Sequence, residues 1–146
     1  MRRFVPLLVV ALIAITVGTS VASKDGKSPH TALQGYCPVA YVVMGKAVKG
    51  DPKVSSVNEG HRYLFVNADA KKMFDAEPTK YQVAYEGWCA TAVSMGKKLK
   101  SDPKLFTLHD GRTYLFSNAE AKKTFDGMPD GVIKRADAQW ALLERK

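Results

Sequence analysis

The chain contains one unit of sequence twice. Residues 44–78 and 95–129 align without a gap at an offset of 51, with identical residues at 19 of 35 positions. Just upstream the offset becomes 52, so that the Gly-Tyr-Cys of residues 35–37 corresponds to the Gly-Trp-Cys of residues 87–89. A single unit of this length cannot bury both faces of a hairpin, whereas two packed copies can. The repeat therefore predicts one domain built from two similar modules.

Each copy reads as two strands followed by a helix. In the first copy, short β-prone runs at 54–57 and 63–66 flank a glycine turn, and Asn67 is a favourable N-cap for a helix that reaches Phe74. The second copy repeats this pattern. The Tyr-Leu-Phe aromatics should point toward the helix and form the core with its phenylalanine. We expect an α+β fold in which two pseudo-twofold-related ββα repeats pack as one small domain.

The turn-forming and apolar segments also predict the boundaries of the domain. A helix rich in alanine is expected to join the two copies. The expected segments are a flexible leader at 23–32, a domain at 33–146, repeat one at about 35–81, a joining helix at 85–95, repeat two at about 87–133 and a closing helix at about 136–143.

The first 22 residues have the pattern of a secretory signal peptide. Arg2 and Arg3 precede an apolar run at 4–17, and Ser-Val-Ala at 20–22 is a small-x-small cleavage site. The apolar run is too short for a membrane span. We expect a mature chain without a membrane span, located in the periplasm or secreted.

The charge pattern and the motifs argue against nucleic-acid binding and against enzyme activity. The net charge is +8, and it becomes +6 when Arg2 and Arg3 are removed. The lysines are scattered over helix faces and form no basic stripe with interleaved aromatics, so nucleic acid is not expected as a partner. The chain also lacks the common nucleophile, metalloprotease and phosphate-loop motifs, so no enzyme activity is expected.

Several motifs resemble secreted YHS-domain proteins. The resemblance begins with Leu-Gln-Gly-Tyr-Cys-Pro-Val-Ala-Tyr at 33–41, and it continues through Gly-His-Arg-Tyr-Leu-Phe at 60–65 and Glu-Gly-Trp-Cys-Ala at 86–90. It implies a role in handling metals, copper especially. Cys89 matches the cysteine of the secreted branch. Cys37 stands where the family has aspartate.

The two cysteines leave three alternatives open. In an exported protein, two cysteines at equivalent positions often form a disulfide, and Cys37 and Cys89 would then have Cα atoms within about 7 Å. A second alternative is a dithiolate site for Cu(I) or another soft metal ion. The third is a pair of separate thiols.

Three further residues are candidate metal ligands. Met44 and Met95 follow the cysteines at equivalent places, so each could supply a thioether, although methionine also fills gaps in cores. His61 lies beside a predicted hairpin turn, where a histidine is either a ligand or simply solvated.

We therefore expect an exported, non-enzymatic binding protein that handles a soft or borderline metal ion such as copper. One alternative is a disulfide-stabilised structural or interaction module whose partner is a periplasmic protein. Another is a binder of a small organic ligand or haem in a pocket between the repeats, lined by Tyr36, Tyr41 and Trp88.

Overall fold

The computed structural model describes residues 28–146, so the predicted signal peptide and the first half of the predicted leader, residues 23–27, lie outside the described residues. Helices and strands alternate along this part of the chain, which confirms the α+β class. Between residues 28 and 146, no helix is both long enough and apolar enough to cross a membrane.

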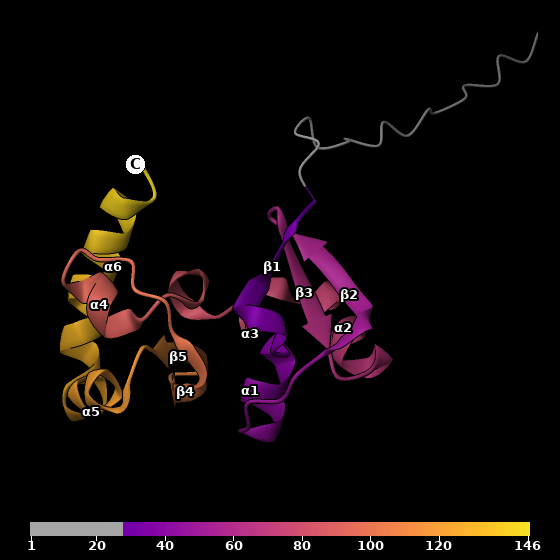
Figure 1. The fold of residues 1–146 in the computed structure, drawn as a ribbon. Coiled ribbons are helices and arrows are strands. Elements are labelled where there is room, and N and C mark those ends of the chain that lie inside the picture. Colours follow the sequence, from indigo (N-terminus) through magenta and orange to yellow (C-terminus); the bar gives the residue numbers. More distant parts are fainter. Residues whose placement is uncertain (1–27) are drawn as a thin grey trace, which may run out of the picture.

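The two copies contain the same kinds of element in the same order. The first consists of η1 (Ala32–Gly35), α1 (Pro38–Met44), β2 (Asp51–Asn58), β3 (His61–Phe65), α2 (Ala68–Ala76) and α3 (Pro78–Tyr81). The second consists of η2 (Ala84–Gly87), α4 (Ala90–Ser94), β4 (Asp102–His109), β5 (Arg112–Phe116), α5 (Ala119–Gly127) and α6 (Pro129–Leu143). In Figure 1 the first copy lies on the right and the second on the left. Each hairpin and the helix after it begin 51 residues apart in the two copies, so the predicted ββα unit is confirmed in both.

Local sequence explains how these elements begin and turn. The side chains of Asn67 and Asn118 each accept a hydrogen bond of 2.8 Å from the backbone N–H three residues further on. Both asparagines therefore cap their helices as predicted. At the first hairpin turn, Glu59 and Gly60 have φ values of 49° and 79°. Two consecutive residues with positive φ are typical of a tight two-residue hairpin.

The first copy has a third strand that the sequence did not predict. β1 (His30–Thr31) pairs in parallel with β3, which makes the strand order β1-β3-β2, whereas β4 and β5 form a two-stranded sheet. Among the described residues, regular structure thus begins at His30. The last three residues of the predicted leader therefore belong to the fold, because His30 and Thr31 pair with β3 and Ala32 begins η1.

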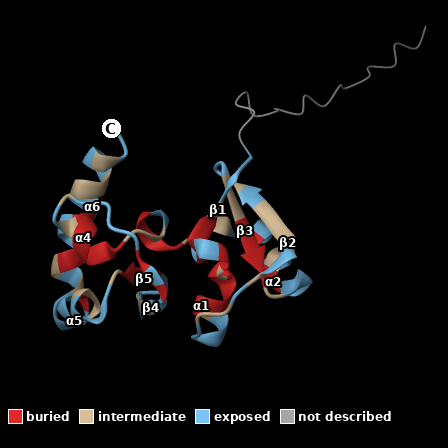
Figure 2. Cartoon of the chain, in the orientation of Figure 1, coloured by how far each residue is buried: buried red, intermediate tan, exposed pale blue. Residues whose placement is uncertain are grey.

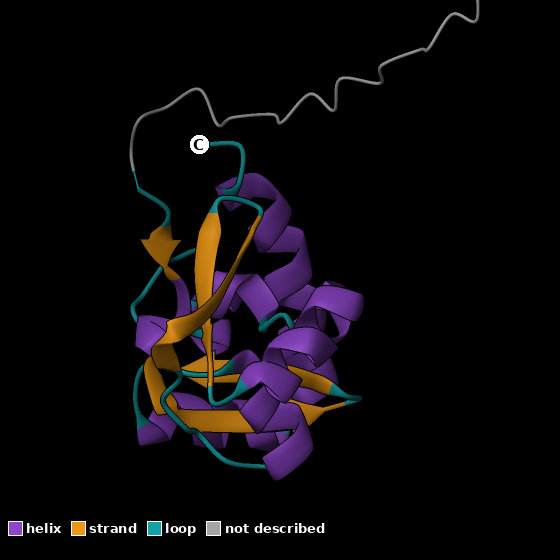
Figure 3. Ribbon diagram, turned by 90° about the vertical axis from the view of Figure 1, so that its right-hand side faces the viewer, coloured by secondary structure: helices purple, strands orange, loops and turns teal. Residues whose placement is uncertain are grey.

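The helices of the second copy also differ from the prediction. The helix expected at 85–95 is divided into η2 and the shorter α4. Tyr85 and Glu86 have φ values of 54° and 52°, in the left-handed region, and this conformation interrupts a right-handed helix. The closing helix is longer than expected, because α6 begins at Pro129, a residue type favoured at the first helical position. Helices and strands of both copies are visible in Figure 3.

The repeated aromatic residues form the core of each copy, as predicted. In the first copy, the Phe74 ring lies 4.9 Å from the ring of Tyr63 and 5.2 Å from that of Phe65. The three equivalent rings of the second copy are separated by 4.9 and 5.1 Å. All six are buried, and Figure 2 shows the buried segments within both copies.

The middle residue of the second Tyr-Leu-Phe strand joins the two copies. Tyr114 and Phe116 belong to the core cluster of the second copy, but Leu115, which is fully buried, belongs to that of the first. Successive side chains of a strand point to opposite faces. One face of β5 therefore packs against its own helix, and the other face packs against the first copy.

Two further contacts cross this seam between the copies. The Tyr41 hydroxyl donates a hydrogen bond of 2.7 Å to the carbonyl oxygen of Pro103, and its ring lies edge-on, 4.9 Å from the ring of Phe106. The equivalents of Tyr41 and Phe106 are Val93 and Ser55, which cannot make the same contacts. These contacts are therefore one-sided, and the pseudo-twofold relation between the copies stays a prediction.

Candidate functional site

The two cysteines occupy equivalent places but different surroundings. Cys37 and Cys89 immediately precede α1 and α4, and both are free and fully buried. Cys37 belongs to the core cluster of the first copy and Cys89 to that of the second. A fully buried free cysteine behaves as a small apolar core residue, whereas reactive thiols need access to solvent. Both thiols are therefore core residues of separate clusters, and the expected approach of their Cα atoms to within about 7 Å stays a prediction.

The other predicted metal ligands lie apart from the thiols. Met44 is the last residue of α1, seven positions after Cys37, so the helical rise places their Cα atoms about 10 Å apart. The side chains of Met44 and Met95 are 50% and 62% exposed. His61 lies on β3 and lines a cleft that contains no cysteine or methionine. The structure therefore does not gather these five residues into one site.

The burial of the thiols predicts their reactivity. We expect neither Cys37 nor Cys89 to react with a thiol reagent such as Ellman's reagent in the native protein, because each side chain is fully buried. In denaturant without reductant, both should react. Detection of two thiols only after a reductant is added would show instead that the pair is oxidised.

The three aromatic residues predicted to line a pocket between the repeats do not share one. Tyr41 is fully buried in the seam, where its hydroxyl is already bonded to Pro103. The Tyr36 ring is covered by Lys49, whose Nζ atom lies 5.4 Å from the ring centroid. Trp88 does line a cavity, of about 280 Å³. Both copies line this cavity, so Trp88, one of the three predicted residues, does lie at a cavity between the repeats.

A larger cleft of about 340 Å³ opens between the two copies, and we refer to it as the inter-repeat cleft. The first copy contributes the β2–β3 turn, β3 and the end of α3, and the second contributes η2, β5 and α6. Its aromatic residues are Tyr63, Tyr85 and Trp140. Neither copy could form this cleft alone.

Tyr85 packs against two other aromatic rings of the second copy. Its ring lies 5.8 Å from that of Trp140 and 6.1 Å from that of Tyr114. Its hydroxyl donates a hydrogen bond of 2.8 Å to an oxygen of Asp137. Burial, and then this bond to a carboxylate, raise the pKa of Tyr85 far above its ordinary value. The phenol is therefore neutral, and its ring is fixed between η2 and α6.

Charged side chains surround the opening of the cleft. Glu59, Glu86 and Glu144 are exposed carboxylates, and Arg112 is the basic residue of the lining. Gln82 donates a 3.4 Å hydrogen bond to the Glu59 carboxylate. With three carboxylates and one guanidinium, the lining is acidic, although the whole chain carries a net charge of +8.

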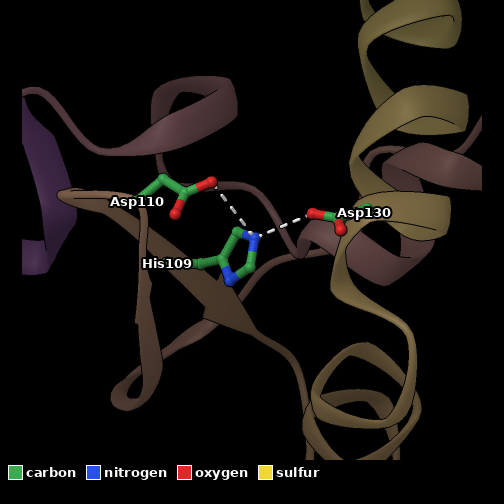
Figure 4. A group of neighbouring side chains, drawn as sticks. All are labelled: His109, Asp110 and Asp130. Atoms are coloured by element: carbon green, nitrogen blue, oxygen red, sulfur yellow. Dashed lines mark hydrogen bonds and ion pairs between the residues drawn. The ribbon is translucent and has the colours of Figure 1, made fainter.

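A separate polar group lies at the other hairpin turn. The Nε2 atom of His109 is 2.9 Å from Oδ1 of Asp130 and 3.5 Å from Oδ2 of Asp110 (Figure 4). It connects the β4–β5 turn to the first turn of α6. Both carboxylates are 90% exposed. The bond from His109 to Asp130 therefore ties the β4–β5 turn to α6.

Sequence reasoning proposed none of the cleft residues except His61. One signal was present, because Leu33-Gln34-Gly35 and Tyr85-Glu86-Gly87 are equivalent segments with the same left-handed backbone. The second copy thus places an aromatic ring and a carboxylate where the first has leucine and glutamine. A comparison of the differences between the copies, rather than their identities, could have identified these two residues.

Comparison of the chain with models of known protein families, with curated proteins and with solved structures found no match.

Proposed function

We propose that this protein is an exported, non-enzymatic binding protein that holds a small organic molecule in the inter-repeat cleft. The observation that carries the proposal is the composition of the cleft. Three aromatic side chains from both copies surround a volume of about 340 Å³, with hydrogen-bonding groups at its edge. Ligand pockets are commonly of this size and form between packed units, and here polar and charged side chains stand beside the three rings and can orient a ligand.

The size of the cleft narrows the kind of ligand. Its volume lies near the lower end for ligand pockets, which favours a small molecule over a haem macrocycle. Export follows from the predicted signal peptide, and membership of the YHS family likewise stays a proposal that rests on the motifs.

Binding of copper or another soft metal by the cysteines is less well supported. Cys37 and Cys89 are fully buried in separate clusters, and the methionines lie at the surface. A soft-metal site needs thiolate or thioether ligands that converge on one point. The alternative of a disulfide-stabilised interaction module is also less well supported, because both cysteines are free and belong to different core clusters.

The proposed function can be tested with a panel of cationic, neutral and anionic aromatic molecules. We expect at least one to quench the fluorescence of a Trp88→Phe variant, in which Trp140 is the remaining tryptophan and lines the cleft. A Thr79→Trp substitution should abolish this binding, because Thr79 is an exposed residue of the lining and an indole there would fill the opening.

Thr124→Trp is the matched control, because Thr124 is an exposed threonine on α5 that lines a different hollow. It should leave binding unchanged. Binding that is equally strong in the Thr79→Trp variant would place the ligand elsewhere, and the absence of any binding would contradict the proposed function.

A further inference from the structure

The three carboxylates of the inter-repeat cleft are not neutralised by ion pairs with other described residues. Among residues 28–146, ion pairs are formed by lysines on α2, α3 and α5 and by His109, and none involves Glu59, Glu86 or Glu144. Surface carboxylates that face a cleft without a basic partner leave a negative potential there, because low-dielectric walls focus the field. The cleft therefore attracts positive charge.

The aromatic rings around the cleft already accept cations in this structure. The guanidinium carbon of Arg112 lies 5.6 Å from the centroid of Tyr85 and 5.9 Å from that of Tyr114. The Nζ atom of Lys98 lies 4.9 Å from the Trp140 centroid. Both fall within the range of cation–π attraction. No described lysine or arginine lies over Tyr63. Its side chain is only 7% exposed, and the part that lines the cleft is the part that a cation from outside the chain can reach.

Two of the cleft carboxylates lie near enough to Tyr63 to act on it electrostatically. Burial, and then the negative charges of Glu59 and Glu86, raise the pKa of Tyr63. The two carboxylates come from different copies, because Glu59 lies in the β2–β3 turn and Glu86 lies in η2. They therefore act together on the same aromatic ring of the cleft, and Phe74 supports this ring at 4.9 Å within the core.

We propose that the inter-repeat cleft takes an organic ammonium ion, either a primary amine or a quaternary ammonium group on a small apolar body. The ammonium group lies against Tyr63 beside Glu59 and Glu86, and the apolar body lies toward Tyr85 and Trp140. This inference rests on the proposed function and names its class of ligand.

An inorganic ion fits this place less well. Among the described residues, the one set of three His, Cys, Asp or Glu side chains with ligand atoms within 4.8 Å of one another is His109, Asp110 and Asp130, at the other hairpin turn. The cleft carboxylates are thus too widely spaced to coordinate a metal ion together with a third such group. An ammonium group is larger and needs only nearby negative charge and a π face.

Three probes of similar shape and different charge test the class of ligand: 2-phenylethylamine, 2-phenylethanol and phenylacetate. In calorimetric titrations at pH 7 and low salt, we expect the amine to bind about tenfold more tightly than the alcohol, because the carboxylates and the tyrosine ring both favour the positive charge. Phenylacetate should bind most weakly. Equal binding of the amine and the alcohol, or tightest binding of phenylacetate, would overturn the inference.

Variants that remove one charge of the cleft test whether amine binding changes in the expected direction. Glu59→Gln and Glu86→Gln should each weaken amine binding by about three- to tenfold and leave the alcohol unchanged, because only the charge is removed. Arg112→Gln should strengthen amine binding, since the competing positive charge is lost. Glu120→Gln, an exposed glutamate on α5, is the control and should have no effect. Weaker amine binding in Arg112→Gln would contradict the assignment.

The outcomes separate this inference from the proposed function. If phenylacetate or the alcohol binds best and Thr79→Trp blocks it, the cleft is a ligand site but not an ammonium site. If none of the three probes binds, the ammonium assignment is wrong. The proposed function then depends on whether another member of the panel is excluded by Thr79→Trp.

Discussion

Replacement of Phe125 by alanine is expected to lower the free energy of unfolding by about 3–5 kcal/mol. The Phe125 side chain is fully buried, and its ring lies 4.9 Å from that of Tyr114, 5.1 Å from that of Phe116 and 6.3 Å edge-on from that of His109. Its removal takes away buried apolar area and leaves a cavity that three fixed rings cannot close.

Urea unfolding followed by circular dichroism measures this loss. Phe74→Ala provides an internal replicate, because Phe74 is 1% exposed and has equivalent neighbours in the first copy. Met128→Ala is the control, since Met128 is 55% exposed and should cost less than about 1 kcal/mol. A loss below about 1 kcal/mol for Phe125→Ala would show that the ring does not hold the second core together.

Replacement of Gly50 by alanine should be the most damaging addition of a single methyl group in the chain. A Cβ atom on Gly50 would lie 2.4 Å from the carbonyl carbon of Leu64 and 2.6 Å from the backbone nitrogen of Phe65. Backbone atoms of a paired strand cannot rotate away as a side chain can. We expect a loss of about 1–3 kcal/mol or more, as β3 shifts and the 2.8 Å hydrogen bond from Gly50 N–H to the Gly35 carbonyl weakens.

The second copy supplies the matched control, because the position equivalent to Gly50 is Ser101. This residue already carries a Cβ atom, and its hydroxyl donates a 2.5 Å hydrogen bond to the carbonyl oxygen of Gly87. Ser101→Ala should therefore cost only about 0.5–1.5 kcal/mol, for the lost hydrogen bond. If Gly50→Ala lowered the free energy of unfolding no more than Ser101→Ala, the β3 backbone could not lie as close to Gly50 as described.

The residues of the candidate site were harder to predict from the sequence than the repeats were, because the site forms only in the tertiary structure. Cys37, Cys89, Met44 and Met95 stand out in the sequence because they recur, but recurrence here reflects the equivalent helix ends that both copies need. In the cleft, Tyr63 recurs as Tyr114, but Tyr85 and Glu86 stand where the first copy has Leu33 and Gln34. The cleft also draws on α6, which has only the four-residue α3 as its counterpart in the first copy.

The sequence by itself determined the repeated ββα unit, because its signals act within a few residues. Asn67 caps a helix through a bond to the residue three positions on, and the turn at Glu59 and Gly60 needs only its own backbone conformation. Alternation in Tyr-Leu-Phe likewise placed the aromatic rings on the helix side. Such local interactions depend little on the rest of the chain.

Only the tertiary structure decided how the copies meet and where the cleft lies. The Tyr41–Phe106 contact and the burial of Leu115 in the first copy's core both depend on segments distant in sequence. Glu59 and Trp140 line one cleft although 81 positions separate them. No local pattern encodes such a meeting, because it results from the packing of two finished modules, whose apolar faces match in shape rather than in sequence.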